Sequence, residues 1–441
     1  MPIKLSHYSR STTLISLTFA ALSIVALIYP PLPVLTLLAD SDQYRQMSEQ
    51  ILAGHLLETG CQPPDAQHLA VSLRPPLFPL LLGVASHIPG VDPVNALISL
   101  HIILAAFALL ATLVLTGTAI KPLLTIAATG IALFSAKQVA WGVMSEWLAM
   151  VWLFLACTAY LSWISRPSWQ LALAVSLCTS LAILTRTALL PWLAIPVFMV
   201  LQAPRGGHRG TATGLLAGLL PLFLWGAINC ARTGAFALVR YEGLNLVATA
   251  RSLGPIPFDS RDSEDQQHLI TTINAQGSTA PDSAFKPTEV HRWDGEFYRA
   301  FHANFDQVTA AMQTLSDASV ARPTSIAARG LRAHADRYRL FLKGGVQTLI
   351  AHYLPLVGLC LVAALWLWRR APHHARWSLG VITIAAVTLG YLCIIFTSML
   401  WLHRYFIPVQ PILLFCLVVS GVQLVGTFVV ERGYRTFNRE G

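Results

Sequence analysis

The stretch SEWLAMVWLFLACTAYLSWISR, residues 145–166, has an acid at its second position and a base at its last, with no charge between them. A run of this length is typical of a helix that crosses a bilayer, which needs about 20 apolar residues. Further charge-free runs lie along the chain, and most of them are long enough to span. They are 11–39, 94–120, 122–136, 168–185, 187–204, 210–231, 346–368, 377–402 and 405–430. Residues 137–143 would complete the short run at 122–136.

The composition agrees with these runs. Hydrophobic residues make up 55% of the chain and charged residues 12%, and the mean hydropathy is +0.58; an average soluble domain is far more polar. We therefore predict an all-α polytopic membrane protein of about ten transmembrane helices. Spans one to seven form an N-terminal module, 1–231, and spans eight to ten a C-terminal module, 346–441. Residues 40–92 form an outer first loop, and residues 232–345 a larger extracytoplasmic loop region.

The charges predict the orientation of the chain. With both termini in the cytoplasm, every inner loop is basic, as the positive-inside rule requires. Nineteen of the 21 carboxylates then face outward, so the net charge of +9 reflects insertion and contact with anionic lipid rather than nucleic-acid binding. The first run, preceded by Lys4 and Arg10, is too long for a secretory signal and is predicted to be an uncleaved anchor in the inner or plasma membrane.

The first outer loop contains amphipathic and apolar pieces. Met47, Ile51, Leu52 and Leu56 have the spacing of an amphipathic helix over 44–57, lying on the membrane interface. A second apolar segment, 77–88, is too short to span. The outer first loop is therefore predicted to carry amphipathic helices.

The larger loop region, 232–345, is mostly polar and the most soluble-like part of the chain. Residues 307–316 and 325–342 are predicted to be helical, whereas 259–265 and 274–286 are predicted to be loops. The second helix carries a series of arginines, interpreted as a solvated or headgroup-facing surface. They are Arg329, Arg332, Arg337 and Arg339.

Seven cysteines are present, and five of them fall inside predicted spans, where they resemble small buried apolar residues. Only Cys61 and Cys230, the latter at the outer end of the run 210–231, could meet outside the membrane. A disulfide between them is one possibility that the sequence leaves open.

Polar residues at the outer ends of the spans should be neighbours in space, because all these ends meet at one rim. These residues are Asp40, Asp42, Arg74, Lys137, Glu146, Arg186, Lys343, His352, His403, Arg404 and Tyr405. Carboxylates beside a group of cations suit a reaction on an anionic, lipid-linked substrate: an acid removes a proton while cations hold a phosphate. Ionisable groups at a membrane are expensive and therefore point to function.

Five motifs together resemble the GT-C superfamily of integral membrane glycosyltransferases, most closely the branch of the protein O-mannosyltransferases and the lipid A aminoarabinose transferase. The motifs are Asp40-Ser41-x-x-Tyr44 with Ala53-Gly54-His55, Arg74-Pro-Pro-Leu-Phe-Pro79, Ser145-Glu146, Leu184-Thr-Arg186-Thr-Ala-Leu-Leu-Pro191, and Arg404-Tyr405-x-x-Pro408-x-x-Pro411. The resemblance extends from the first span to the last. It departs from the family at Ser41, which stands where the family commonly has a glutamate, so that either Asp40 or Asp42 is the working acid.

The resemblance implies an inverting transfer of a sugar from a polyprenyl-phosphate donor to an acceptor at the outer face. Asp40, with Asp42 as the alternative, would take the acceptor's proton, and the family's second acid falls on Glu146. The departing phosphate would be held by cations, and neighbouring side chains would position the substrates. The cations are Arg404, Arg186, Arg74 and Lys343, and the positioning residues are Tyr44, His403 and Tyr405.

Each role has a structural alternative. Asp40 also suits the N-cap of the interfacial helix, and Glu146 also suits a cap of the fourth span or an ion pair with Lys137. Arg74 and Arg186 also suit interfacial anchors that extend to lipid headgroups. The His403-Arg404-Tyr405 segment also suits an interface belt.

No cofactor is required by this reading, and no metal site is predicted, although some members of the superfamily use a divalent cation. The acids form no compact ligand set in sequence, and no zinc motif is present on an outer segment. The acceptor stays open between a glycan, a lipid and a protein. Two other functions are compatible: a lipid-linked glycan ligase or polymerase with a pyrophosphate donor, and a lipid or solute transporter, which the absence of an internal repeat disfavours.

Overall fold

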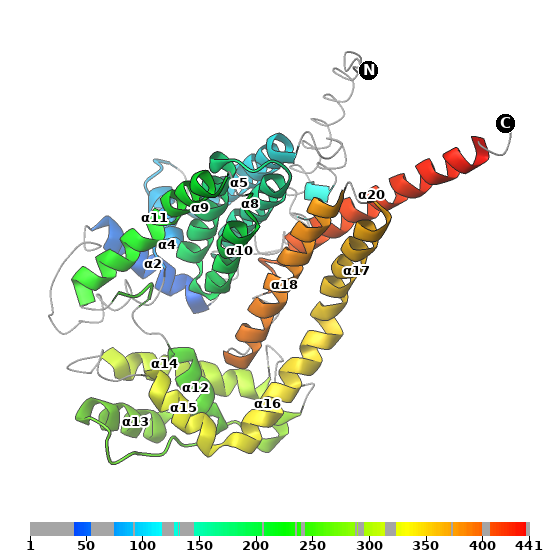
Figure 1. Ribbon diagram of the computed structural model, residues 1–441. Helices are drawn as coiled ribbons and strands as arrows, with labels where there is room; N and C mark the ends of the chain where they lie inside the picture. Colours follow the sequence, from blue (N-terminus) through cyan, green and yellow to red (C-terminus); the bar gives the residue numbers. More distant parts are fainter. Residues whose placement is uncertain are drawn as a thin grey trace.

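A computed structural model of the chain describes the following residues: 39–53, 75–90, 93–116, 128–130, 132, 145–204, 207–233, 236–239, 243–286, 289, 295–313, 323–371, 374–398 and 406–437. Within these residues every regular element is helical, and no strand occurs. The first predicted span and most of the third lie outside them. Figure 1 shows a layer of helices joined by a long helix to a smaller helical unit.

The chain is an integral membrane protein by the length and composition of its helices. Among the described residues, four helices are long and apolar enough to cross a membrane: Ser145–Ser165, His208–Ala231, Ala335–Arg370 and Ala375–Phe396. Five shorter apolar helices accompany them in the described part of the chain: Leu77–Ser86, Ser99–Val114, Trp169–Thr185, Thr187–Gln202 and Gln410–Val425. Eight of these nine segments coincide with predicted spans, and Leu77–Ser86 is the apolar segment predicted to be too short to span. The total of ten spans stays a prediction.

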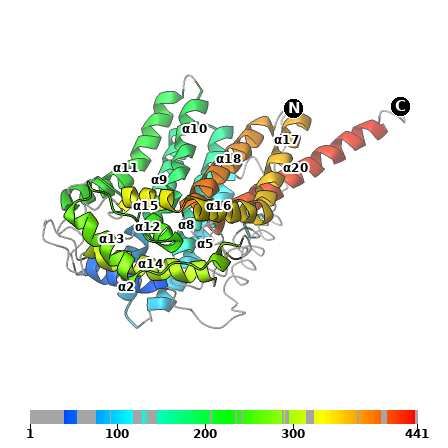
Figure 2. The same cartoon turned by 90° about the horizontal axis from the view of Figure 1, so that it is seen from below.

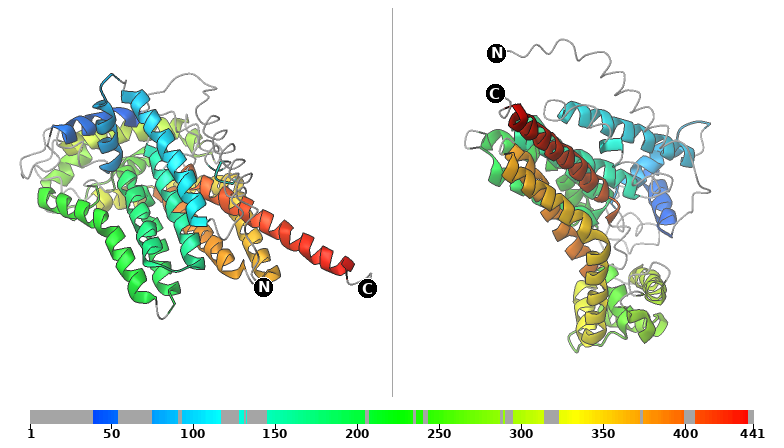
Figure 3. Two further views of the ribbon diagram at one scale, coloured as in Figure 1. Left: turned by 90° about the horizontal axis from the view of Figure 1, so that it is seen from above. Right: turned by 90° about the vertical axis from the view of Figure 1, so that its right-hand side faces the viewer.

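Helix α8 (Ser145–Ser165) lies at the centre of the membrane helices. Almost all of its residues are buried, because it is apolar on every side and has neighbours on every side. It packs against α5 (Pro93–Thr116), α9 (Trp169–Thr185), α18 (Ala375–Ser398) and α20 (Gln410–Phe437). Figure 3 shows the far end of α20 extending away from this group.

Helices α9 and α11 (His208–Thr233) approach closely through small residues. Ser176 and Ser180 of α9 donate hydrogen bonds to the carbonyls of Gly214 and Gly218 on α11, at 3.2 and 2.9 Å. A Cβ atom on Gly218 would come within 2.0 Å of the Ser176 Oγ. Small residues that let two backbones meet are a common means of helix association in membranes.

After α9 the chain turns through a 3₁₀ segment, η2 (Thr187–Leu193), into α10 (Ala194–Gln202). Pro191 lies inside η2 and cannot donate a backbone hydrogen bond, which favours this irregular start. The fifth and sixth spans are thus joined by the tight connection at Arg186 that the sequence predicts.

Helices α2 (Ala39–Leu52) and α4 (Leu77–Ser86) come from the first outer loop and pack against each other. The helix predicted for 44–57 begins earlier, at Ala39, and residues beyond 53 lie outside the described part. Its Met47 and Ile51 are buried, as predicted for an apolar face, whereas Leu52 is 41% exposed. A Cβ atom on Gly83 of α4 would approach the Ser48 Oγ of α2 to 2.9 Å, so the two helices fit closely.

The region predicted as a large loop is a folded helical unit. It contains α12 (Leu244–Leu253), α13 (Glu264–Gln276), η3 (Asp282–Phe285), α14 (Glu296–Gln313), α15 (Pro323–Ala333) and α16 (Ala335–Thr348). Two apolar clusters hold it together, one of which includes Val247, Ile270 and Ile326 and the other Phe285, Phe297 and Phe341. Figure 2 shows α13 and α14 side by side at this end of the molecule.

The sequence-based reading of this unit needs correction in three places. Helices α12 and α13 were not predicted, and α14 starts eleven residues before the predicted position 307. A capping box between Ser263 and Gln266 begins α13 and was the sequence signal for it. The segment 274–286, predicted as loop, contains the end of α13 and the short η3.

The arginines of α15 and α16 are tied to acids of the same unit. Arg329 contacts Asp262 at 2.7 Å, and Arg337 contacts Asp282 at 2.7 Å. Arg337 also donates to the Leu253 carbonyl at 2.7 Å. These contacts join the two helices to the segment before α13, to η3 and to the end of α12. The side chains of Arg329 and Arg337 are 18% and 33% exposed, and the interpretation of a solvated or headgroup-facing surface stays a prediction.

A single long helix connects the unit to the membrane. Helix α16 continues through a π-helical turn, η4 (Leu349–Tyr353), into α17 (Leu354–Arg370). These 36 residues correspond to about 54 Å of helix, whereas the hydrocarbon core is about 30 Å thick. The α16 part therefore reaches well beyond the bilayer and supports the unit outside it.

Candidate active site

Three consecutive residues at the start of α8 contact three other elements. Ser145, Glu146 and Trp147 are all buried, with exposed fractions of 0%, 0% and 1%. Successive residues of an α-helix point about 100° apart, because 3.6 residues make a turn. Each of the three side chains therefore meets a different neighbour, and together they anchor this end of α8 from three sides.

Ser145 contacts helix α2. Its Oγ lies 2.8 Å from the hydroxyl of Tyr44, a buried hydrogen bond in which either oxygen can donate. The Tyr44 ring packs edge-on against Phe78 of α4, with 4.8 Å between ring centroids. Tyr44 thus has an apolar ring in the core and a polar tip on α8, which is the usual arrangement for a buried tyrosine.

Glu146 contacts Arg186, the residue between α9 and η2. The Arg186 Nη1 forms an ion pair with the Glu146 Oε1, and the two side chains are 9% and 0% exposed. Two charges removed from water are costly, so a buried pair of this kind is stable only while both partners are present. The sequence also allowed an ion pair between Glu146 and Lys137. Lys137 lies outside the described residues, so that pairing stays a prediction.

The backbone explains why Arg186 reaches Glu146. Helix α9 ends at Thr185, and Arg186 adopts an extended conformation with φ −147° and ψ 109°. Its N–H still donates to the Ala182 carbonyl at 2.9 Å, so the break is local. The break places Arg186 at the end of α9 that lies beside the start of α8, since the two helices pack along their length.

Trp147 contacts helix α5. Its indole Nε1 donates to the carbonyl of His101 at 3.2 Å, and the His101 imidazole lies between the rings of Trp147 and Phe78. The centroid distances are 6.4 Å to Trp147 and 6.3 Å to Phe78. The rings of Phe78, His101 and Trp147 thus connect α4, α5 and α8 next to the polar contacts of Ser145 and Glu146. Neither Ser145 nor His101 was singled out as a site residue from the sequence.

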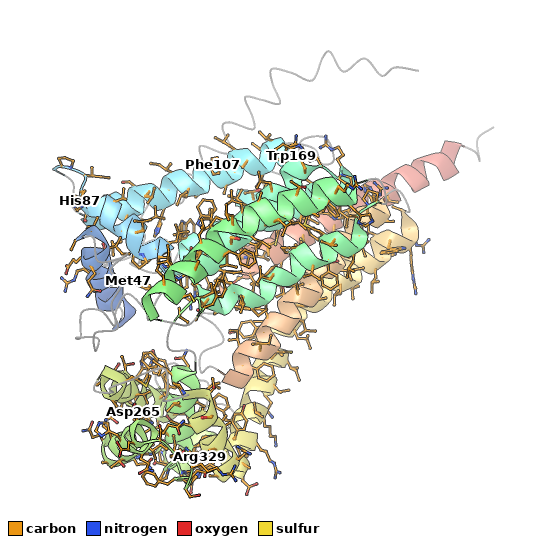
Figure 4. All side chains as sticks on the ribbon, turned by 60° about the vertical axis from the view of Figure 1, so that its left-hand side comes forward. Met47, His87, Phe107, Trp169, Asp265 and Arg329 are labelled. Carbon is orange, nitrogen blue, oxygen red and sulfur yellow. The ribbon has the colours of Figure 1, made fainter. Side chains whose placement is uncertain are left out.

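The start of α8, with the contacts of Ser145, Glu146 and Trp147, is called the junction below. It lies at the end of the helical layer that faces the extramembrane unit. Figure 4 places Met47 of α2 toward the unit that carries Asp265 and Arg329, and places Trp169, which begins α9, at the opposite end of the layer. Arg186 follows the other end of α9. Of the polar residues predicted to meet at one rim, Glu146 and Arg186 are in contact, and Tyr44 meets Ser145, the residue before Glu146.

Other candidate residues lie partly or wholly outside the described structure. Asp40 and Asp42 lie in α2, but their side chains are not described. Lys343 is exposed on α16 and forms no ion pair with the described residues. The candidates outside the described residues are Arg74, His403, Arg404 and Tyr405.

The π-helical turn η4 is a second irregular feature that the sequence did not indicate. Its Tyr353 is buried and packs on Phe406, with 4.4 Å between ring centroids. Phe406 directly follows the motif Arg404-Tyr405 in the sequence. Single π turns within long helices occur frequently at functional sites, and this one lies where α16 enters the membrane helices.

Thiols and metal ligands add no further site in the described part of the chain. No group of three or more His, Cys, Asp or Glu side chains that could hold a metal ion occurs among the described residues. Cys230 is an exposed free thiol, and its possible partner Cys61 lies outside those residues.

Comparison with known proteins gives one similarity. No protein-family model matches the chain, and no curated protein matches it. Among solved structures, the chain is similar to the crystal structure of ArnT from Cupriavidus metallidurans in the apo state. The identity is 12% and the TM-score 0.40, over 93% of this chain and 78% of that one.

Proposed function

We propose that this protein is a membrane glycosyltransferase that moves a sugar from a polyprenyl-phosphate donor to an acceptor at the outer face of the membrane. The observation that supports this most is the buried ion pair of Glu146 and Arg186, joined through Ser145 and Tyr44 to the helix that carries Asp40. An ion pair at this position costs desolvation energy. Binding of a substrate with a charged phosphate would explain why the protein retains this costly ion pair.

The reaction is an in-line displacement at the anomeric carbon. The acceptor's oxygen or nitrogen forms a bond to C1, the bond from C1 to the phosphate oxygen breaks, and its electron pair leaves with the polyprenyl phosphate. Asp40, with Asp42 as the alternative, accepts the proton that the acceptor loses. One displacement inverts the configuration at C1, and it needs one base and a stabilised leaving group.

The leaving phosphate is held by cations. Arg186 contacts Glu146 through one terminal nitrogen, and a guanidinium carries five N–H groups in a fixed fork. That fork suits a carboxylate on one side and a phosphate oxygen on another, with Glu146 orienting the charge. Arg404, Arg74 and Lys343 are proposed to complete the cationic group.

Two further elements support the placement of these cations. Lys343 lies on α16, which leads into η4, and Tyr353 of η4 packs on Phe406, two positions after Arg404. His403 and Tyr405 are proposed to position the substrates around them, and Tyr44, which is buried and bonded to Ser145, to do so through the placement of α2. No metal ion is assigned a role in this scheme.

The test is release of polyprenyl phosphate by purified protein in lipid nanodiscs. The substrates are a labelled polyprenyl-phosphate sugar and, as acceptor, a lipid extract of the cell envelope. We expect acceptor-dependent release by the wild type and a loss of about a hundredfold or more in Asp40→Asn. Glu49→Gln is the matched control, because Glu49 is an exposed acid on the same helix and should keep full activity.

Asp42→Asn decides between the two candidate bases, since only the working base should give the full loss. Full activity in both the Asp40→Asn and Asp42→Asn variants would remove the proposed mechanism. In sealed proteoliposomes, movement of the labelled lipid across the membrane without release of polyprenyl phosphate would instead indicate a transporter.

A further inference from the structure

Ser145 is a buried residue whose hydroxyl binds across two helices. Most buried hydroxyls of the membrane helices donate to a carbonyl of their own helix, as Thr158 does to Phe154 at 3.0 Å and Ser162 does to Thr158 at 2.9 Å. Ser145 instead shares its hydrogen bond with Tyr44, which is 101 positions away in the sequence. This contact is specific to one relative position of α2 and α8.

The two ends of this hydrogen bond adjoin the two proposed acids. Asp40 and Tyr44 are four residues apart on α2, so their positions lie one turn apart on the same face of the helix. Ser145 directly precedes Glu146 on α8. One hydrogen bond therefore spans the helices that carry the proposed base and the proposed partner of the phosphate-binding arginine.

The remaining packing of α2 does not by itself set this position. In the described residues α2 packs mainly on α4, where Ser48 meets Gly83, and it reaches α8 chiefly through Tyr44, whose ring belongs to the apolar cluster that includes Leu148. Apolar contacts are non-directional and permit small shifts of a helix. A buried hydrogen bond has strict distance and angle requirements and resists them.

We propose that Ser145 is a positioning residue, which acts through Tyr44 to hold α2 at a defined distance from the Glu146 and Arg186 pair. This inference rests on the proposed function. Small displacements of a reacting group are expensive, since a shift of about 1 Å can lower a rate on the order of a hundredfold. The hydrogen bond matters for the rate of the chemical step and not for binding the donor, because the ion pair remains in place without it.

The experiment compares Ser145→Ala, Tyr44→Phe and the double variant in the release assay. We expect each single variant to lower kcat by roughly tenfold to a hundredfold. The KM for the polyprenyl-phosphate sugar should change less than about twofold in both. Because both substitutions remove the same bond, the double variant should lose no more than the more affected single variant.

Tyr160→Phe is the matched control. Tyr160 is also on α8, and its hydroxyl donates to the Gln202 side chain at 2.9 Å, so the variant removes a tyrosine hydrogen bond at the other end of the same helix. It should keep wild-type kcat. Thermal unfolding and gel filtration verify folding, and Tyr44→Phe keeps the ring packed on Phe78 if Ser145→Ala proves unstable.

Three results would overturn the inference. Wild-type kcat in both single variants would show that the bond is not needed, and multiplying losses in the double variant would show that the two residues act separately. An equal rise of KM with unchanged kcat would assign them to donor binding. A wild-type protein that releases no polyprenyl phosphate overturns the proposed function as well, whereas active wild type with fully active variants overturns only the positioning role.

Discussion

Two buried arginines, one in each part of the molecule, are held in opposite ways. Arg186 at the membrane junction is paired with a carboxylate from a different helix, Glu146. Arg251 in the extramembrane unit is 4% exposed and donates to the carbonyls of Ile273, Asn274 and Gly277 and to the Thr279 hydroxyl. All of these acceptors come from one short segment.

The difference indicates two uses of a buried cation. Peptide carbonyls around Arg251 replace water and fold the segment after α13 against α12, and burial lowers the pKa of this guanidinium below its ordinary value. A carboxylate on another helix adds a full opposite charge, so Arg186 ties two spans and responds to any new anion nearby. We therefore expect Arg251 to serve folding and Arg186 to serve chemistry.

The largest effect is expected for Arg186→Gln. Loss of the guanidinium removes a proposed phosphate ligand and leaves Glu146 buried without this partner, so turnover should fall about a hundredfold to a thousandfold. The measurement is kcat for polyprenyl phosphate release, normalised to folded protein. The exchanged pair Glu146→Arg with Arg186→Glu should recover thermal stability but not turnover. Recovery of both would reduce the ion pair to a structural role.

Arg251→Met should act on stability alone. It leaves several buried carbonyls without a donor, and hydrogen bonds to a charged group contribute about 1.5 to 3 kcal/mol each before non-additivity. We expect the unit to lose on the order of 3 kcal/mol. Hydrogen exchange should report it as faster exchange over α12 and α13. Turnover per folded molecule should stay near the wild-type value, and a selective loss of turnover would contradict the contrast with Arg186.

Gly218→Ala tests the close packing of α11 against α9, the helix that ends just before Arg186. The added Cβ would meet the Ser176 Oγ at 2.0 Å and the Leu177 backbone nitrogen at 2.6 Å, which typically costs about 1 to 3 kcal/mol through displacement of one helix. The thermal midpoint should fall. Gly390→Ala on α18 is the control, since a Cβ there meets nothing within 4 Å. Equal midpoints for the two variants would contradict the close approach of α9 and α11.

The smallest effect is expected for Arg339→Ala. Arg339 pairs with Asp336 at 3.1 Å, but both side chains are largely exposed, at 78% and 94%. Exposed pairs of this kind contribute under about 0.5 kcal/mol in most cases. Chemical denaturation and the release assay should both be close to wild type. A clear loss of activity would mean that α16 binds a substrate through this face.

Much of the membrane part follows from the apolar runs. Each described run is helical, and the ends of the fourth and fifth spans meet, as Glu146 and Arg186 demonstrate. The extramembrane unit was predicted less well. Its helices are amphipathic and short, and signals such as the Ser263 and Gln266 capping box are weak beside a span of about 20 apolar residues.

The candidate site, too, was predicted from the sequence only in part. The residue types and their order along the chain predicted Tyr44, Glu146 and Arg186 as candidates, but not the partner of each. Ser145 belongs to the Ser145-Glu146 motif, but its own role could not be predicted, because a serine at the start of a helix is also a common cap. The π turn at Leu349–Tyr353 likewise depends on packing against Phe406.

The sequence by itself determined that the chain contains apolar helices suited to a membrane, because the bilayer admits long apolar helices, and it predicted from the basic loops which span ends share a side. Only the tertiary structure decided that Glu146 binds Arg186 and that Tyr44 binds Ser145. Helix α8 is apolar on all sides, so the distribution of apolar residues along its sequence does not predict how the helix is rotated about its axis. That rotation is set by packing against its neighbours, and it determines which partner each polar residue meets.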